Sequence, residues 1–222
     1  MKKLVLTALV LLSGTSLYAY TNGDAFQFFG GGGGISYGDA QNDHGSPGEY
    51  YSGSSPYFKT AESCISFAWN IGFSGEIFVT DNISMNFGIM KENVKVKTVS
   101  PKANANSDAE YQFDFEFMSI PAGVHYYNNL FFFGGGIFYS LIQGQSVKVR
   151  GFNEDLHPFL AKDDYGFFID AGANLDVADK VNILVFARYK KGFAEIYKYH
   201  EIIEHVENIQ TLTLNASVGI KI

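Results

Sequence analysis

The amino-acid sequence predicts an all-β fold, an eight-stranded antiparallel up-and-down transmembrane β-barrel. Three observations lead to this prediction. Apolar and polar residues alternate along many segments, the connections between those segments alternate between short and long, and the chain opens with the pattern of a secretory leader. A period of two is typical of a strand with one apolar face, and a tilted strand of about eleven residues is long enough to cross a bilayer.

The alternation is clearest at the C-terminus, where Leu212–Ile222 reads LTLNASVGIKI and every second residue is apolar. Seven further segments of the chain show a similar pattern. The eight predicted strands are Ala25–Gly38, Ser63–Thr80, Ile83–Val99, Tyr111–Tyr127, Leu130–Arg150, Asp164–Val177, Asn182–Lys198 and Leu212–Ile222.

The connections between the predicted strands fall into two classes. Tight turns are predicted near Asp81, Asn128 and Asp179. Short turns on the periplasmic side and long loops outside are the pattern of outer-membrane barrels. Both ends of the barrel chain then lie on the short-turn side, and the four long connections are 39–62, 100–110, 151–163 and 199–208.

The N-terminal residues have the layout of a signal peptide. A lysine pair precedes the apolar run Leu4–Leu12, and small polar residues follow it. This run is too short for a transmembrane helix. We predict cleavage after Ala19, with Ser16 as the alternative. Residues 1–19 are then the signal peptide and residues 20–222 a single barrel domain in the outer membrane.

Composition agrees with this class of protein. The formal net charge is −7, and an acidic surface argues against nucleic acid as a partner. The chain contains 21 Phe, 14 Tyr and 24 Gly but only 5 Pro, which suits a barrel flanked by aromatic girdles. Cys64 is the only cysteine, so it cannot form an internal disulfide and is expected to be a small buried residue.

The fourth predicted strand changes phase along its length. Phe113 and Phe117 belong to the apolar set of its first half, whereas Ile120 and Val124 belong to the set of its second half. A slip of one residue is what a β-bulge produces. We therefore predict a bulge in this strand, and Pro121 fits an irregular site of that kind.

Alternation alone does not show which face of the barrel points inward. The polar faces carry charges and the apolar faces are continuous and rich in aromatic residues, which favours a membrane barrel over a soluble one. Inward charges need partners because an isolated buried charge is costly. We expect a structural charge network that closes the lumen to solutes, with a narrow ion pathway as the alternative. The predicted members of this network are Glu76, Asp114, Glu116, Asp170, Asp176, Arg188 and Lys190.

Two glycine runs, Gly30–Gly34 and Gly134–Gly136, lie in the first and fifth predicted strands. The first lacks the Lys-Ser/Thr of a phosphate-binding loop and neither precedes a helical pattern, so a structural role is expected. The similar sequences around them suggest a four-strand duplication as a hypothesis. Because glycine is poor strand material, we expect the seam between Phe26–Gly38 and Leu212–Ile222 to be irregular or weakly paired.

Four phrases resemble the small OmpA/OmpX-like outer-membrane β-barrel domain family. They are MSIPAGVHYY (Met118–Tyr127), FFFGGGIFYSL (Phe131–Leu141), FFIDAGANLDV (Phe167–Val177) and ILVFARYKKG (Ile183–Gly192). The resemblance covers the chain after the leader and implies an eight-stranded barrel with a side-chain-filled lumen and exposed loops. Such proteins commonly end in an aromatic residue, whereas this chain ends in Ile222.

Residues that could carry out chemistry show no recognisable arrangement. His125 lies in the fourth predicted strand and the other four histidines lie in connections. The phrase HEIIEH at 200–205 does not have the spacing of a HExxH zinc motif, and no Ser–His–acid set is visible. We predict no catalytic residue, metal site or cofactor, with a lipid A-modifying enzyme as the less favoured alternative.

The remaining predictions concern partners. We expect a monomer that contacts outer-membrane lipid and binds no nucleic acid. The four long connections could present a surface to an extracellular or host ligand. The longest of them, 39–62, is rich in Gly, Ser and Tyr, a composition that makes adaptable contacts and equally suits an ordinary solvated loop.

Overall fold

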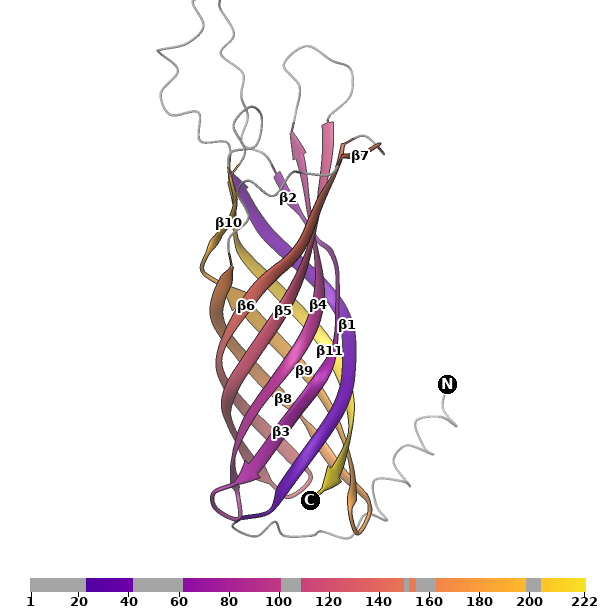
Figure 1. The fold of residues 1–222 in the computed structure, drawn as a ribbon, viewed down its shortest axis with the longest axis vertical. Coiled ribbons are helices and arrows are strands. Elements are labelled where there is room, and N and C mark those ends of the chain that lie inside the picture. The colour runs from indigo at the N-terminus through magenta and orange to yellow at the C-terminus, as the bar shows by residue number, and fades with distance from the viewer. Residues whose placement is uncertain (1–22, 42–61, 101–108, 150–151, 155–162, 199–204) are drawn as a thin grey trace, which may run out of the picture.

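The computed structural model describes residues 23–41, 62–100, 109–149, 152–154, 163–198 and 205–222 (Figure 1). Within these ranges, no helix is long and apolar enough to cross a membrane. The predicted leader 1–19 and most of each predicted long connection lie outside the described residues. The strands are β1 (Ala25–Gln41), β2 (Glu62–Cys64), β3 (Ser66–Phe78), β4 (Ile83–Ser100), β5 (Ala109–Asn128), β6 (Phe131–Val149), β7 (Phe152–Glu154), β8 (Asp164–Ala178), β9 (Val181–Gly192), β10 (Glu195–Lys198) and β11 (His205–Lys221).

Eight of these strands form the closed wall of an antiparallel barrel. Their order is β1-β3-β4-β5-β6-β8-β9-β11, and β11 pairs with β1 to close it. The short strands β2, β7 and β10 pair with β4, β6 and β11 and extend the wall at its loop end (Figure 1). The predicted eight-stranded barrel is therefore confirmed. The last strand begins at His205 rather than Leu212, so it takes in part of the predicted connection 199–208.

The apolar face of the wall points outward. Phe73, Ile137 and Leu214 are 67%, 70% and 65% exposed, whereas Glu76 and Asp170 are 2% and 0% exposed. A soluble barrel would show the reverse arrangement, with its apolar residues inside. The outward apolar surface belongs to a barrel that spans a membrane.

This polarity inverts toward the loop end of the barrel. On β5, Phe113, Phe115 and Phe117 point inward and are at most 2% exposed. Asp114 and Glu116 between them lie on the outer face and are only partly buried. The wall here has an apolar interior and a polar exterior, as in a soluble barrel. The expectation that these three phenylalanines face lipid, with both acids inside, is therefore corrected.

The change of phase along the β5 sequence reflects a change in what surrounds the barrel wall. It does not reflect a shift in the pairing register of β5. Along β5, alternate side chains point inward without interruption, and β5 keeps one register with β4. The predicted bulge in β5 is therefore wrong. A register shift does occur in the β5–β6 pairing, between Glu116 and Phe117, where Gln143 is the extra residue of β6. Pro121 is buried within the regular stretch of β5.

Two apolar clusters fill the interior at the two ends of the barrel. The turn-side cluster lies beside the short turns, and the loop-side cluster lies at the level of the inverted wall. The turn-side cluster consists of Phe26, Phe28, Phe78, Tyr127, Phe132, Leu184 and Phe186. The loop-side cluster consists of Ala68, Val94, Val96, Phe113, Phe115, Phe117, Ala194, Val206 and Ile209.

The seam between the first and last strands is regular. β1 and β11 pair over twelve consecutive residues, from Phe26↔Lys221 to Tyr37↔Gln210, and the register shifts only beyond Tyr37. The expected weak seam is therefore wrong. Close approach of the two backbones explains the glycines, because a Cβ on Gly32 would overlap the carbonyl oxygen of Leu214.

The two glycine-rich strands lie opposite one another. Three strands separate β1 from β6 in either direction around the barrel, as their order in the sequence suggests. Cys64, at the end of β2, is only partly buried, so the expectation of a buried residue is corrected.

Candidate functional site: a polar network inside the barrel

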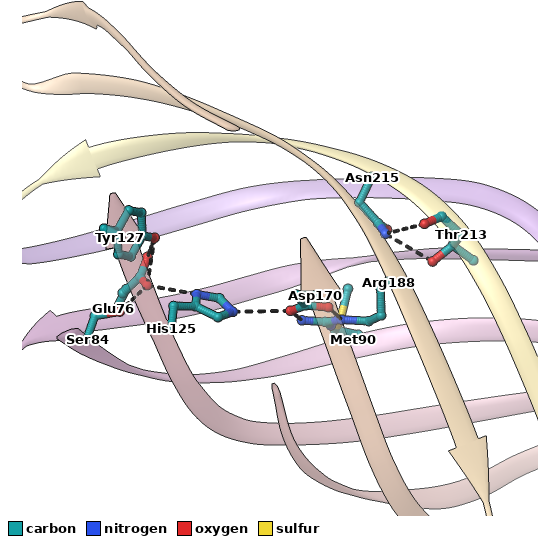
Figure 2. Close-up of polar contacts among 9 residues, drawn as sticks. All are labelled: Glu76, Ser84, Met90, His125, Tyr127, Asp170, Arg188, Thr213 and Asn215. Carbon is teal, nitrogen blue, oxygen red and sulfur yellow. Dashed lines mark hydrogen bonds and ion pairs between the residues drawn. The ribbon is translucent and has the colours of Figure 1, made fainter. Parts of the chain in front are cut away.

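A chain of four charged or polar side chains crosses the barrel interior between the two apolar clusters (Figure 2). His125 on β5 lies between Glu76 of β3 and Asp170 of β8. Its Nδ1 is 2.9 Å from Glu76 Oε1 and its Nε2 is 3.2 Å from Asp170 Oδ2. Two carboxylates can only accept, so a ring bonded to both donates from both nitrogens and carries a positive charge.

Asp170 is held from its other side by Arg188 of β9. Arg188 Nε donates to Oδ1 at 2.8 Å and Nη2 donates to Oδ2 at 2.6 Å. The guanidinium carbon lies 4.5 Å from the ring centroid of Phe168 and 5.4 Å from that of Phe186. A bidentate ion pair between aromatic rings is strong and fixed in orientation, so this pair anchors the chain.

Glu76 ends the chain at the turn-side cluster. The hydroxyl of Tyr127 donates to the Glu76 carboxylate at 2.8 Å, and the hydroxyl of Ser84 donates to it as well. Ser84 of β4 is paired with Phe78 of β3 on one side and with His125 of β5 on the other. The carboxylate thus accepts from donors on β4 and β5 and is 2% exposed.

A second group of polar contacts lies nearer the loop end. Lys190 of β9 forms an ion pair with Glu92 of β4. Its ammonium also donates to the hydroxyls of Ser119 and Ser140, each at 3.1 Å, and lies 3.9 Å from the ring centroid of Phe138. Three acceptors and one aromatic face therefore surround the buried ammonium of Lys190.

Adjacent aspartates fix the loop-side end of β8 to both neighbouring strands. Asp164, which is 3% exposed, accepts the backbone N–H of Tyr165 at 2.8 Å and that of Ala194 at 3.2 Å. Asp163 accepts the hydroxyl of Tyr139 at 2.6 Å and the backbone N–H of Ile142 at 3.1 Å. These carboxylates bind backbone donors where the regular pairing of β8 stops.

The structure brings four of the seven predicted network residues inside, namely Glu76, Asp170, Arg188 and Lys190. Asp176 lies near the turn-side end of β8, in phase with the inward residues, and is partly buried. The other two lie on the outer face, where each is near a lysine: Glu116 is 3.1 Å from Lys91 and Asp114 is 3.8 Å from Lys148.

Sequence reasoning missed several members of the network. Glu92 continues the polar phase of Ser84 along β4, and His125 lies in the polar phase of the second half of β5. Extending each alternation by a few residues would have found both. The serines that contact Lys190 carry no such signal, because small hydroxyl residues occur on both faces of a strand.

The described part of the chain contains no group of three or more His, Cys, Asp or Glu side chains placed to hold a metal ion. This arrangement of side chains neutralises buried charge. Each buried cation is matched to a carboxylate from another strand, and the bonds connect β3, β4, β5, β8 and β9 across the lumen.

Comparison with known proteins gives both a family and a fold. The family model described as an outer membrane protein beta-barrel domain matches residues 26–198. The outer membrane protein AlkL, solved in lipid bilayers, is similar with a TM-score of 0.50 and 14% identity over 93% of each chain. Comparison with curated proteins finds no match.

Two other solved structures are similar at low identity. Neisserial surface protein A is 15% identical, with a TM-score of 0.47, over 89% of this chain and 99% of its own. Outer membrane protein W of E. coli is 15% identical, with a TM-score of 0.44, over 91% of this chain and all of its own.

Proposed function

This chain belongs to the outer membrane protein β-barrel domain family and lies in the outer membrane, and we propose that it is a closed barrel that acts through the connections it displays outside the cell. The proposal has two parts. The first is that the lumen carries no solute, and the second is that the long connections bind an extracellular or host ligand.

The layering of the lumen supports the first part. An apolar cluster lies at each end, and between them the charged side chains are paired with one another. An ion entering from either side would have to leave its water among aromatic side chains, which is unfavourable. Further on, it would have to break ion pairs whose members are buried. The alternative of a narrow channel requires a continuous path that this layering opposes.

Conductance measurements test the closed lumen. Purified protein, inserted into planar bilayers, is expected to give no single-channel steps, while its insertion is verified by heat-modifiable gel migration. A clear and reproducible conductance step from pure protein would overturn the proposal in favour of the channel.

The binding role rests on the sequence of the connections and on the closed lumen. If the lumen carries no solute, the outer surface is the part of the protein that can bind a partner. The connections 39–62, 100–110, 151–163 and 199–208 lie largely outside the described residues. Variants shortened in one connection at a time are expected to lose binding to host cells or matrix. Equal binding by a variant shortened in all four connections and by the parent would contradict this role.

The proposal includes no catalytic activity, and it treats the protein as a monomer. It also includes removal of residues 1–19 on export. N-terminal sequencing of the protein purified from outer membranes is expected to begin at Tyr20. A first residue of Leu17 would place cleavage after Ser16 instead.

A further inference from the structure

A cavity of about 40 Å³ lies in the barrel interior beside the Glu76–His125–Asp170–Arg188 chain. Glu76, His125 and Arg188 all line it, together with Asn86. The polar network described above therefore has one free side that faces space and not protein.

The cavity exists because one stretch of the wall carries almost no side chain. Gly30 pairs with Gly72 on one side and with Ser217 on the other, and all three line the space. A Cβ on Gly30 would overlap the backbone of β11, so the sequence cannot fill the cavity from this position. The close approach of the backbones at these glycines therefore leaves the space open.

Donors face this space without a strong protein acceptor. Asn86 is 8% exposed, and its Nδ2 is buried without a hydrogen-bond partner among the described residues. Arg188 Nη1 contacts the sulfur of Met90 at 3.2 Å, which is a weak acceptor. Buried donors in native proteins almost always have a partner, either protein or ordered water.

We propose that this cavity is a permanent binding site for water. A buried polar site needs at least roughly 10–15 Å³ and two to four polar partners to hold a water molecule, and liquid water takes about 30 Å³ per molecule, so the cavity of about 40 Å³ has room for one or two. These molecules accept hydrogen bonds from Asn86 and Arg188 and donate to Glu76. The inward donors of Asn86 and Arg188 make the site unsuitable for a cation.

Water-edited solid-state NMR on the whole protein in phosphatidylcholine bilayers tests the proposal. Magnetisation from water is expected to reach the Asn86 side-chain amide and the His125 ring early. The rings of Phe132 and Phe168, which are buried and do not line the cavity, serve as dry references. Transfer to Asn86 and His125 as slow as transfer to these rings would overturn the proposal.

A pair of variants sharpens the result. Asn86→Leu is expected to lose the early transfer to His125, because it removes the donor and fills the space. Asn86→Ser, whose hydroxyl can still donate a hydrogen bond, is expected to keep the early transfer. Heat-modifiable migration verifies that both variants fold. If Asn86→Leu does not fold, the wild-type measurement by itself tests the proposal. The water site does not depend on whether the barrel conducts, which the planar-bilayer experiment measures separately.

Discussion

Arg188 and Asp170 form a bidentate ion pair in the barrel interior, with bonds of 2.8 Å and 2.6 Å. The two residues lie opposite one another in the β8–β9 pairing, so the backbone brings them together without further rearrangement. Asp170 is fully buried and Arg188 is 9% exposed. The pair connects β8 and β9 to His125 of β5, and β6 lies between β5 and β8 in the wall.

Asp170→Asn is expected to destabilise the barrel strongly because it leaves the guanidinium buried without its counter-charge. Removing one partner of a buried pair costs about 3–5 kcal/mol. The double variant Asp170→Asn, Arg188→Met is expected to be more stable than the single variant, because no unpaired cation remains. Urea unfolding in phosphatidylcholine vesicles measures the free energy of unfolding for both.

Glu116→Gln is the matched control for this experiment. Its ion pair with Lys91 lies on the outer face, where the two side chains are 47% and 50% exposed. Exposed pairs contribute about 0–1 kcal/mol, so little change is expected. A loss as large as that of Asp170→Asn would show that burial does not decide the cost.

Neighbouring glycines on β1 are expected to respond differently to substitution. A Cβ on Gly32 would overlap the carbonyl oxygen of Leu214, whereas a Cβ on Gly33 would meet the ring of Phe67 at an ordinary 3.4 Å. Gly32→Ala is therefore expected to impair closure of the seam and Gly33→Ala to be tolerated. Heat-modifiable gel migration reports the folded fraction of each. Equal folded fractions would refute the close-approach explanation.

Asp164→Ala is expected to loosen the loop-side end of β8 and β9 without unfolding the barrel. The substitution leaves the backbone N–H groups of Tyr165 and Ala194 without their acceptor. An unsatisfied buried donor costs about 1–3 kcal/mol, which corresponds to roughly 10- to 100-fold faster local amide exchange. Hydrogen exchange followed at Ala194 measures this change.

Asp164→Asn provides the comparison, because the amide oxygen can still accept. Its exchange at Ala194 is expected to lie near that of the wild type. If the alanine and asparagine variants exchange equally fast, the carboxylate charge and not the hydrogen bond holds this end together.

The barrel could be predicted from the sequence because strand number and turn position depend on local patterns. The turn after β5 is an example: Asn128 and Asn129 signal it, and Asn129 has the positive φ of 55° that asparagine tolerates. The alternation of β8 likewise gives its inward residues directly, and Asp170 is among them.

Other features depend on surroundings that no local pattern records. The alternation of β5 is continuous, but its meaning reverses between Phe117 and Ile120, where the wall passes from water to lipid. Nothing in the local sequence marks Gln143 as the extra residue of β6, because register is settled between strands. The pairing of Lys190 with Glu92 joins residues 98 positions apart.

The inversion of the wall predicts opposite outcomes for two lysine substitutions on β6. Ile137 is 70% exposed on the lipid-facing surface, and a lysine there costs about 2–4 kcal/mol near the bilayer midplane. Ser146 lies nearer the loop end and pairs with Asp114 on the outer face. Ser146→Lys is expected to change the free energy of unfolding by less than about 0.5 kcal/mol, because its ammonium is in water beside a carboxylate. Urea unfolding in vesicles compares the two, and a similar cost for both would place the water boundary beyond Ser146 and contradict the inverted wall.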